Sequence, residues 1–403
     1  MEEGKPRLSR ASTQVPTLHG GLEKIIKVAV DRGASDVHIK AGDVFRARID
    51  GKLVPLTKQR LTPEQTKVIA LRLLPTDEDQ ARIDRVRDYD CSWGLPGVGR
   101  FRINILRQRS SFMVVMRVIP FDVPSFDSLH LPPIMATIAG TERGLVLVTG
   151  PAGAGKSSTL AAIVHHINQQ HQRHVVTLEN PIEFLHRDLN SSITQREIGV
   201  DTDDFRRGLR AALRQDPDVI LIGEMRDPVV IDTALRAAET GHLILAALDT
   251  PDAATTIARL VGAFSTAEQS AARLRLSDAL QASVSQCLLP RADGRGRVAA
   301  FEILLATPAV RDLIRASGSA SELQELICSS RDEHGMQSQD QHLVSLVTEG
   351  VVTPEAALAA ALDGPALEPK LRGIPRRTPV PIEAAKVAPA PLADDLTSLL
   401  PGS

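Results

Sequence analysis

The strongest constraint on this sequence is the stretch GPAGAGKS, Gly150 to Ser157, which directly follows the apolar run GLVLVT. It satisfies the pattern GxxxxGK(S/T), in which backbone N–H groups of a glycine-rich loop curl around phosphate oxygens at the start of a helix. A buried strand before the loop and a helix after it are the setting that such a phosphate-binding loop (P-loop) needs. The sequence therefore predicts a nucleotide-binding domain of the α/β class.

The predicted loop gives each of its residue types a role. We expect Lys156 to neutralise the β- and γ-phosphates of ATP and the hydroxyl of Ser157 to hold Mg²⁺, while the small residues offer their backbone to the phosphates. The predicted cofactors are thus ATP and Mg²⁺. The complete set of predicted nucleotide-binding residues is Gly150, Pro151, Ala152, Gly153, Ala154, Gly155, Lys156, Ser157 and Ser158.

A P-loop hydrolyses nothing unless carboxylates for Mg²⁺ and for the attacking water lie at the same edge of the sheet. Two apolar runs end in such acids. The run VILIGE ends with Glu224, and VVTLENPIE supplies Glu179 and Glu183. Each acid alone could be a solvated residue at a strand end, but together with the P-loop they predict an ATP-hydrolysing site.

Composition limits the class of protein. The chain has 403 residues, which is enough for two domains, and a net charge of −2, which gives no bulk attraction to nucleic acid or anionic lipid. Its three cysteines lie far apart, which argues against a zinc ribbon and suits a reducing cytosol. The apolar runs are shorter than the roughly 20 residues of a spanning helix, so we expect no direct membrane insertion.

Composition and periodicity divide the chain into five parts. We expect a mobile arm at 1–21, a small α/β domain at 22–120, a linker at 121–127, an ATPase domain with a C-terminal helical region at 128–364, and a Pro/Ala-rich disordered tail at 365–403. In the second part, an amphipathic helix starts at Leu22 and a hairpin turns at Asp50-Gly51. In the fourth part, short all-apolar runs predict central strands of a parallel sheet.

Four segments of the chain are similar to the nucleotide boxes of the type II/type IV secretion ATPase superfamily. They are GPAGAGKSSTLAAI, TLENPIEF, QREIGVDTDDFRRGLRAALRQDPDVILIGEMRD and AAETGHLILAALDT. Within the superfamily the chain most resembles the type IV pilus retraction ATPases, the PilT type. We expect no additional large N-terminal domain and no four-cysteine insert, and ATPAVRDLIR and HGMQSQDQHL resemble that type's C-terminal region. The resemblance implies a PAS-like small domain followed by a RecA-like P-loop core with a mostly parallel sheet.

The resemblance also implies roles for five residues outside the P-loop. Glu183 matches the glutamate that acts as general base on the attacking water, and Glu224 matches the atypical Walker B glutamate that supports Mg²⁺. Arg102 and Arg117 match small-domain arginines that close over the γ-phosphate. His242 matches the first histidine of the family's His box, and we expect it at the catalytic site.

Two positions depart from the family pattern. Asn180 replaces the aspartate of the usual Glu-Asp-Pro-Ile-Glu box, and Asp249 replaces the second histidine of the His box. One carboxylate is lost and one is gained, so the formal charge of the site is unchanged if the family's histidine is neutral. We expect the two replacements to be coupled. The Asn180 amide would donate a hydrogen bond to Asp249 if the two strand ends are adjacent.

The function implied by the resemblance is ATP-driven retraction of a type IV pilus by a hexameric ring. The implied partners are further copies of the chain, alone or mixed with a paralogue, and the inner-membrane platform protein of the pilus. The implied location is the cytoplasm, at the inner face of the membrane.

A second reading is a degenerate paralogue that binds ATP and regulates or joins such a ring without efficient hydrolysis. We disfavour an extension or secretion ATPase because we expect no additional N-terminal domain, and a P-loop kinase because no acceptor site is apparent in the sequence.

Overall fold

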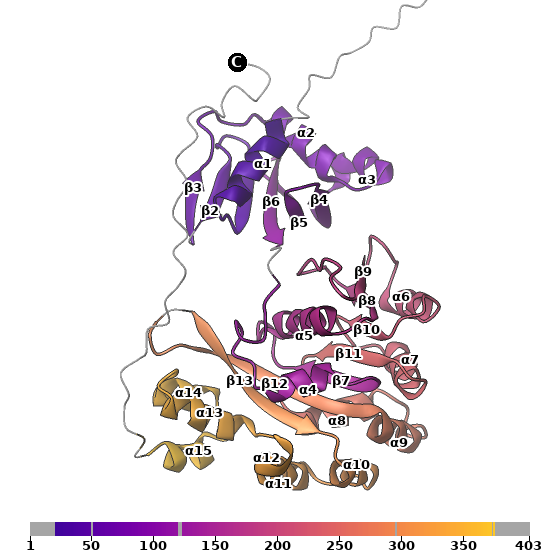
Figure 1. The fold of residues 1–403 in the computed structure, drawn as a ribbon. Coiled ribbons are helices and arrows are strands. Elements are labelled where there is room, and N and C mark those ends of the chain that lie inside the picture. The colour runs from indigo at the N-terminus through magenta and orange to yellow at the C-terminus, as the bar shows by residue number, and fades with distance from the viewer. Residues whose placement is uncertain (1–20, 50, 120–122, 295, 373, 375–403) are drawn as a thin grey trace, which may run out of the picture. The chain divides into compact units, whose positions relative to one another are not determined.

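The computed structural model of the protein describes residues 21–49, 51–119, 123–294, 296–372 and 374. The chain divides between Ile119 and Pro120 into two compact units, each with a hydrophobic core of its own (Figure 1). Residues 1–20 of the predicted arm lie outside the described residues, and its last residue, Gly21, already opens the first helix.

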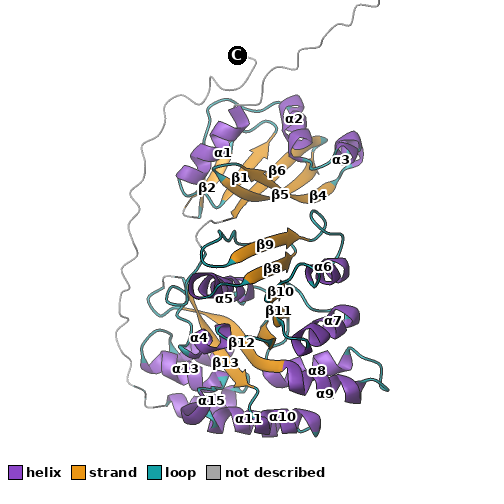
Figure 2. Ribbon diagram, turned by 45° about the vertical axis from the view of Figure 1, so that its right-hand side comes forward, coloured by secondary structure: helices purple, strands orange, loops and turns teal. Residues whose placement is uncertain are grey.

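The N-terminal unit is a six-stranded antiparallel sheet with helices on one face. The strand order is β3-β2-β1-β6-β5-β4. Figure 2 shows α1 and α2 lying together over this sheet. The assignment of this unit to the PAS type stays a prediction. Its elements are α1 Gly21–Asp31, β1 Asp36–Lys40, β2 Arg46–Ile49, β3 Lys52–Pro55, α2 Pro63–Leu73, α3 Asp77–Ala81, the 3-10 helix Ile83–Arg85, β4 Asp88–Leu95, β5 Gly99–Gln108 and β6 Ser111–Ile119.

Local sequence accounts for the helices of this unit. In α1, Leu22, Ile25 and Ile26 form one stripe and are buried against the sheet, as the periodicity predicts. The start of α2 is fixed by a capping box, in which the Thr62 side chain accepts from the Gln65 N–H and the Gln65 side chain accepts from the Thr62 N–H. The predicted helix at Leu22, which is α1, and the predicted hairpin of β2 and β3 are both confirmed.

The second unit is built on a seven-stranded sheet with the order β13-β12-β7-β11-β10-β8-β9. Every neighbouring pair is parallel except β12 and β13. The four predicted apolar strands are confirmed, and the α/β class with a mostly parallel sheet is confirmed with them. The strands are β7 Gly144–Thr149, β8 His174–Glu179, β9 Ser192–Glu197, β10 Val219–Ile222, β11 Leu243–Leu248, β12 Leu280–Pro290 and β13 Arg297–Leu305.

Helices cover both faces of this sheet, which explains why its central strands are apolar throughout. Along β7, Leu145 and Leu147 enter the core beneath α6 to α11, whereas Val146 and Val148 enter the opposite core beneath α4 and α5. These helices are α4 Ile134–Ala139, α5 Lys156–Gln170, α6 Phe205–Ala212, α7 Pro228–Glu239, α8 Ala253–Gly262, α9 Gln269–Ala279, α10 Pro308–Arg315 and α11 Ala320–Ser329.

The C-terminal helical region extends further than the sequence predicts. The last helix, α15, contains Leu367 and Leu371, which are buried in a small core formed with the ends of β12 and β13. The prediction of a disordered tail from residue 365 is therefore wrong for this segment, because two leucines one helical turn apart give it an apolar face to bury. The remaining helices are α12 Arg331–His334, α13 Gln339–Thr348, α14 Pro354–Ala360 and α15 Gly364–Leu371. Among the residues that the structure describes, every helix is too short or too polar to span a lipid bilayer.

One buried carboxyl couples the stability of this unit to pH. Glu302 of β13 is 1% exposed, and its Oε1 accepts a hydrogen bond from the Ala253 N–H at the start of α8 (2.8 Å). Its Oε2 is buried without a hydrogen-bond partner among the described residues. Burial, reinforced by the nearby charges of Asp252 and Asp340, raises the pKa of Glu302 from 4.5 to about 7.

A raised carboxyl pKa means that the folded chain binds a proton that the unfolded chain has released. Stability should therefore fall as the pH rises from about 4.5 through 7, by up to about 3 kcal/mol in total. We expect Glu302→Gln to remove this component and to raise the melting temperature of the full chain at pH 8 by several degrees. Thermal melts of both proteins from pH 5 to 8 test this. Parallel profiles would show that Glu302 stays unprotonated in the folded chain.

Candidate nucleotide site

The P-loop leaves β7 at Gly150 and enters α5 at Lys156. Gly150 has φ 145°, and a Cβ at this position would lie 2.2 Å from the Gln286 carbonyl oxygen of β12. Gly155, the residue before the helix, has φ 90°. Both positions need glycine, the first for close backbone packing as well as conformation and the second for conformation.

The first turn of α5 is open to an anion. No side chain caps it, and its N-cap position is Gly155. In contrast, α7 and α8 on the same sheet are capped by the carboxylates of Asp227 and Asp252. The first N–H groups of α5 therefore remain available, and the positive end of the helix faces the loop. This is the arrangement that binds a phosphate.

The ammonium group of Lys156 donates hydrogen bonds within the loop and to the end of the neighbouring strand β11. Its Nζ donates to the carbonyl oxygens of Gly150 (2.7 Å) and Pro151 (3.1 Å), and to Oδ1 of Asp249 (2.8 Å). The two carbonyl contacts hold the side chain back over the loop. The only strong cation of the P-loop is thus bonded to the loop backbone and to Asp249.

Ser157 and two of the three predicted acids, Glu179 and Glu183, meet at a small cavity of about 60 Å³, and Glu224 is not among its lining residues. The cavity is lined by Ser157 from α5, by Gly223 after β10, and by Glu179, Asn180 and Glu183 at the end of β8. The structure therefore brings together the predicted Mg²⁺ ligand Ser157 and the predicted base Glu183.

The two glutamates after β8 differ in their surroundings. Glu179 is held by the Thr177 hydroxyl (2.6 Å) and the Gln195 amide (3.1 Å), which both donate to its Oε1, and the Glu183 N–H also donates to its carboxylate. Burial raises the pKa of Glu179 above its ordinary value in spite of these contacts. Glu183 is exposed at the rim. Glu179 is thus tied into the strand end, whereas Glu183 lies exposed at the cavity that Ser157 also lines.

Glu224 lies at the end of β10 and is joined to Asp249 through one arginine. Arg226 forms ion pairs with both Glu224 and Asp249, while Lys156 holds the other oxygen of Asp249. The hydrogen bond from Lys156, supported by Arg226, holds the pKa of Asp249 below its ordinary value although burial acts against it. Arg226 was not predicted from the sequence. Arg226 lies two residues after Glu224, past the end of the same strand. This position is the sequence signal that could have identified it.

The expected contact between Asn180 and Asp249 is wrong. Asn180 follows β8 and Asp249 follows β11, and β10 lies between these two strands in the sheet. Two strand spacings separate the strand ends by about 10 Å, which is beyond hydrogen-bond reach. Asp249 is instead balanced by the cations of Lys156 and Arg226.

A cleft of about 570 Å³ opens on the other side of the P-loop, and the sequence did not predict it. Gly155 and Ser158 of the loop line it together with Gln286, Arg291 and Asp293 at the end of β12. The Gln286 amide donates to the Ala154 carbonyl (2.7 Å), and its buried Oε1 has no hydrogen-bond partner among the described residues. The cleft thus adjoins the P-loop at Gly155 and Ser158.

The two predicted arginines belong to the N-terminal unit. Arg102 of β5 and Arg117 of β6 are direct neighbours across the sheet and alternate with buried residues, so they lie on the face opposite the core. The Nε of Arg117 donates to Oδ1 of Asp36 (2.9 Å), and the Asp36 side chain is only 10% exposed. The structure thus brings these arginines together with each other, on a unit separate from the P-loop.

His242 lies at the wrong edge of the sheet for the predicted role. It precedes the six-residue strand β11, whereas the P-loop and Asp249 follow the strands, and its carbonyl accepts from the Gly144 N–H at the start of β7. Six residues of strand separate the two edges by about 20 Å. Its Nδ1 lies 3.0 Å from the Ala237 carbonyl. The structure therefore corrects the prediction that His242 is a catalytic residue of this chain's own P-loop site.

The donors at the small cavity fit Mg²⁺. They are the oxygens of Ser157, Glu179 and Glu183, and hard oxygen ligands are those that Mg²⁺ prefers. The described residues contain no cluster of three or more His, Cys, Asp or Glu that would make a complete protein cage. Nucleotide-bound Mg²⁺ needs no such cage, because phosphates and waters fill most of its coordination sphere.

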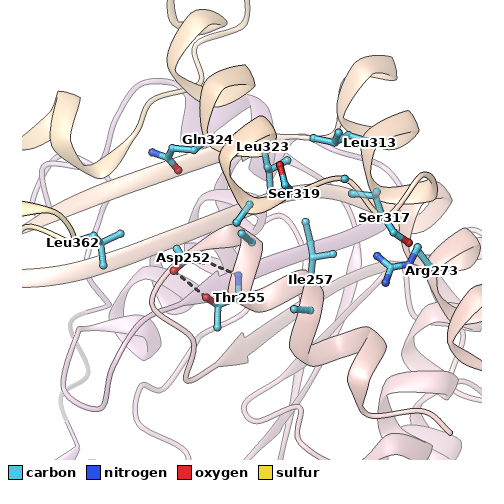
Figure 3. A pocket seen from close by; sticks show the side chains of 15 residues that line it. Asp252, Thr255, Ile257, Arg273, Leu313, Ser317, Ser319, Leu323, Gln324 and Leu362 are labelled. Atoms are coloured by element: carbon cyan, nitrogen blue, oxygen red, sulfur yellow. Dashed lines mark hydrogen bonds between the residues drawn. The ribbon is translucent and has the colours of Figure 1, made fainter. Parts of the chain in front are cut away.

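A larger cavity of about 620 Å³ lies away from the P-loop, between α8, α10 and α11 (Figure 3). Figure 3 shows that one of its polar groups, Asp252, is bonded to the backbone and side chain of Thr255, within the cap of α8. Its walls include Ile257, Leu313 and Leu323. It offers no phosphate-binding loop, and the nucleotide site is therefore assigned to the P-loop edge.

Comparison with known proteins agrees with this assignment. The family model described as "Type II/IV secretion system protein" matches residues 13–357. The chain is 40% identical over 342 residues to the type IV pilus ATPase PilU of Pseudomonas aeruginosa, covering 84% of this chain and 88% of that protein. It is 39% identical over 336 residues to the type IV pilus retraction ATPase PilT of the same organism, covering 83% and 96%. A crystal structure of the pilus retraction motor PilT with bound ADP superposes with a TM-score of 0.78 at 42% identity, covering 86% of this chain and 99% of that one.

Proposed function

The chain belongs to the type II/IV secretion system protein family and is an ATP-hydrolysing enzyme of the pilus-retraction type, and from this premise we propose that it is a hexameric motor that retracts a type IV pilus. The observation that carries the proposal is the meeting of Lys156, Ser157 and Glu183 at one edge of the RecA-like sheet. These residues supply a phosphate cation, a hydroxyl ligand and a base.

Each residue has a part in the proposed reaction. Lys156 and the free N–H groups of α5 bind the phosphates, and the cleft beside Gln286 takes the base and sugar. Glu183 accepts a proton from the attacking water. Mg²⁺, held at Ser157 with support from Glu224, supplies positive charge to the phosphate oxygens when it is bound.

The proposed work stroke uses the two-unit construction of the chain. Arg102 and Arg117 close over the γ-phosphate, so that binding ATP draws the two units together and release after hydrolysis lets them part. In the proposed ring, the N-terminal unit of one copy alternates with the ATPase unit of the next copy. The ring acts on the inner-membrane platform protein of the pilus from the cytoplasm.

Fluorescent labelling of pili in the native host tests the proposed direction of work. Cells that lack this chain should extend pili and fail to retract them, and expression of the wild-type chain should restore retraction. Expression of Lys156→Ala to the same level is the matched control and should not restore it. Normal retraction without the chain would contradict the proposal.

The second candidate function is a regulatory ring subunit that hydrolyses ATP poorly. The observation in its favour is the ion pair of Asp249 with Lys156, which places a negative charge beside the phosphate site. This candidate predicts that the pure chain binds ATP but turns it over little, and that adding a hydrolysing paralogue from the same host raises the rate above that of the paralogue alone. A high rate for the pure chain would exclude it.

The two-unit mechanism makes a prediction for the isolated ATPase unit. Residues 123–374 keep α15 and the whole sheet but lack Arg102 and Arg117, so we expect nucleotide binding with hydrolysis at least about 10-fold slower than that of the full chain. Turnover and ADP binding should be measured on both proteins. Equal turnover would show that the N-terminal unit takes no part in catalysis.

A further inference from the structure

Asp249 stands at the centre of the phosphate-binding edge. It follows β11, which lies between the P-loop strand β7 and the strand β10 that carries Glu224. The side chain is short, so its carboxylate stays beside the end of that strand. A carboxylate is therefore fixed where the resemblance to the family leads one to expect a histidine.

Both oxygens of this carboxylate are held by cations of the site. Oδ1 accepts from Lys156 Nζ at 2.8 Å, and Oδ2 accepts from the Arg226 guanidinium. A phosphate group bridges two cations in the same way, with one oxygen to each. Asp249 thus occupies the anion position that the P-loop lysine would otherwise offer to the terminal phosphate of a nucleotide.

Asp249 is charged at neutral pH, since its cationic neighbours lower its pKa. A terminal phosphate that enters must either displace it from Lys156 or bind beside its negative charge. At a separation of about 5 Å and an effective dielectric constant of about 20, the repulsion between two unit negative charges weakens binding by roughly 300-fold. The side chain is 42% exposed, so solvent screening reduces the effect.

We propose that Asp249 is a specificity-determining residue that competes with the γ-phosphate for Lys156 and Arg226 and so disfavours ATP relative to ADP. The inference rests on the proposed function, because it takes the P-loop to be the ATP site. We expect ADP to be affected less because it lacks the γ-phosphate and therefore brings less negative charge towards Asp249. Loading ATP then requires Asp249 to release Lys156.

The test measures nucleotide binding independently of turnover. The full-length chain is titrated calorimetrically with Mg·ADP and with a non-hydrolysable Mg·ATP analogue, as wild type, as Asp249→Asn and as Asp249→His. Asp249→Asn keeps the size of the side chain and removes its charge. We expect both variants to bind the triphosphate at least about 10-fold more tightly and ADP less than about threefold more tightly. Melting curves of each variant verify folding.

Asp31→Asn is the matched control, because Asp31 also pairs with a lysine, Lys27 at 2.7 Å, on α1 of the N-terminal unit. It should leave both affinities unchanged. Equal tightening of both nucleotides, or no change in either, would overturn the inference while the proposed function stands. Failure of the wild type and of Asp249→Asn to bind either nucleotide would overturn the proposed function together with it.

Discussion

Replacing Lys156 by alanine is expected to abolish ATP hydrolysis. The substitution removes the only strong cation of the P-loop, together with its contacts to the Gly150 and Pro151 carbonyls and to Asp249. Loss of an electrostatic contact made at the reacting phosphate costs a factor of about 10² to 10³, and here the binding of the β-phosphate is lost as well. Steady-state phosphate release from the purified chain is the measurement.

The matched control for this substitution is Lys67→Ala. Lys67 also forms an ion pair with an aspartate, Asp84 at 2.7 Å, but it lies on the exposed surface of the N-terminal unit. This variant should hydrolyse ATP at the wild-type rate. Hydrolysis by Lys156→Ala at the wild-type rate would show that the phosphates of ATP are bound elsewhere on the chain.

Replacing Glu183 by glutamine should lower turnover by roughly 100-fold or more while nucleotide binding persists. Glutamine keeps the length of the side chain but accepts no proton from water. The measurement is a pair of values for each protein, the turnover number and the affinity for Mg·ADP. Only the first should change.

The variant Glu179→Gln tests which of the two glutamates is the general base. Glu179 is fixed by Thr177, Gln195 and the Glu183 N–H, so its replacement should affect turnover less than Glu183→Gln does. The reverse order, with Glu179→Gln inactive and Glu183→Gln active, would make Glu179 the base and Glu183 a residue of the rim.

Much of the core fold could be predicted because its central strands are buried on both faces. The runs that form β7, β8, β10 and β11 are apolar at nearly every position and stand out in the sequence. The strands β9 and β12 were missed for the opposite reason. β9 reads SITQRE, and β12 carries Ser283, Ser285 and Gln286, whose buried polar groups hide the pattern.

The candidate site was predictable only in the part that one local motif encodes. The loop from Gly150 to Ser157 fixes its own geometry, whereas contacts between strand ends depend on the strand order, which no local pattern contains. For this reason Asn180 and Asp249 were expected to touch although β10 separates them. The same reason explains His242, because the sequence does not say which end of β11 faces the P-loop.

The most direct test of the account is ATP turnover of the purified full chain, with the oligomeric mass determined in the same preparation and with Lys156→Ala alongside. We predict a particle of about 260 kDa, six times the 43.4 kDa of the chain, that hydrolyses ATP, and a Lys156→Ala particle of the same mass that does not. A monomer that hydrolyses ATP at full rate, or a hexamer whose slow hydrolysis is unchanged by Lys156→Ala, would contradict the account of this chain as a ring motor.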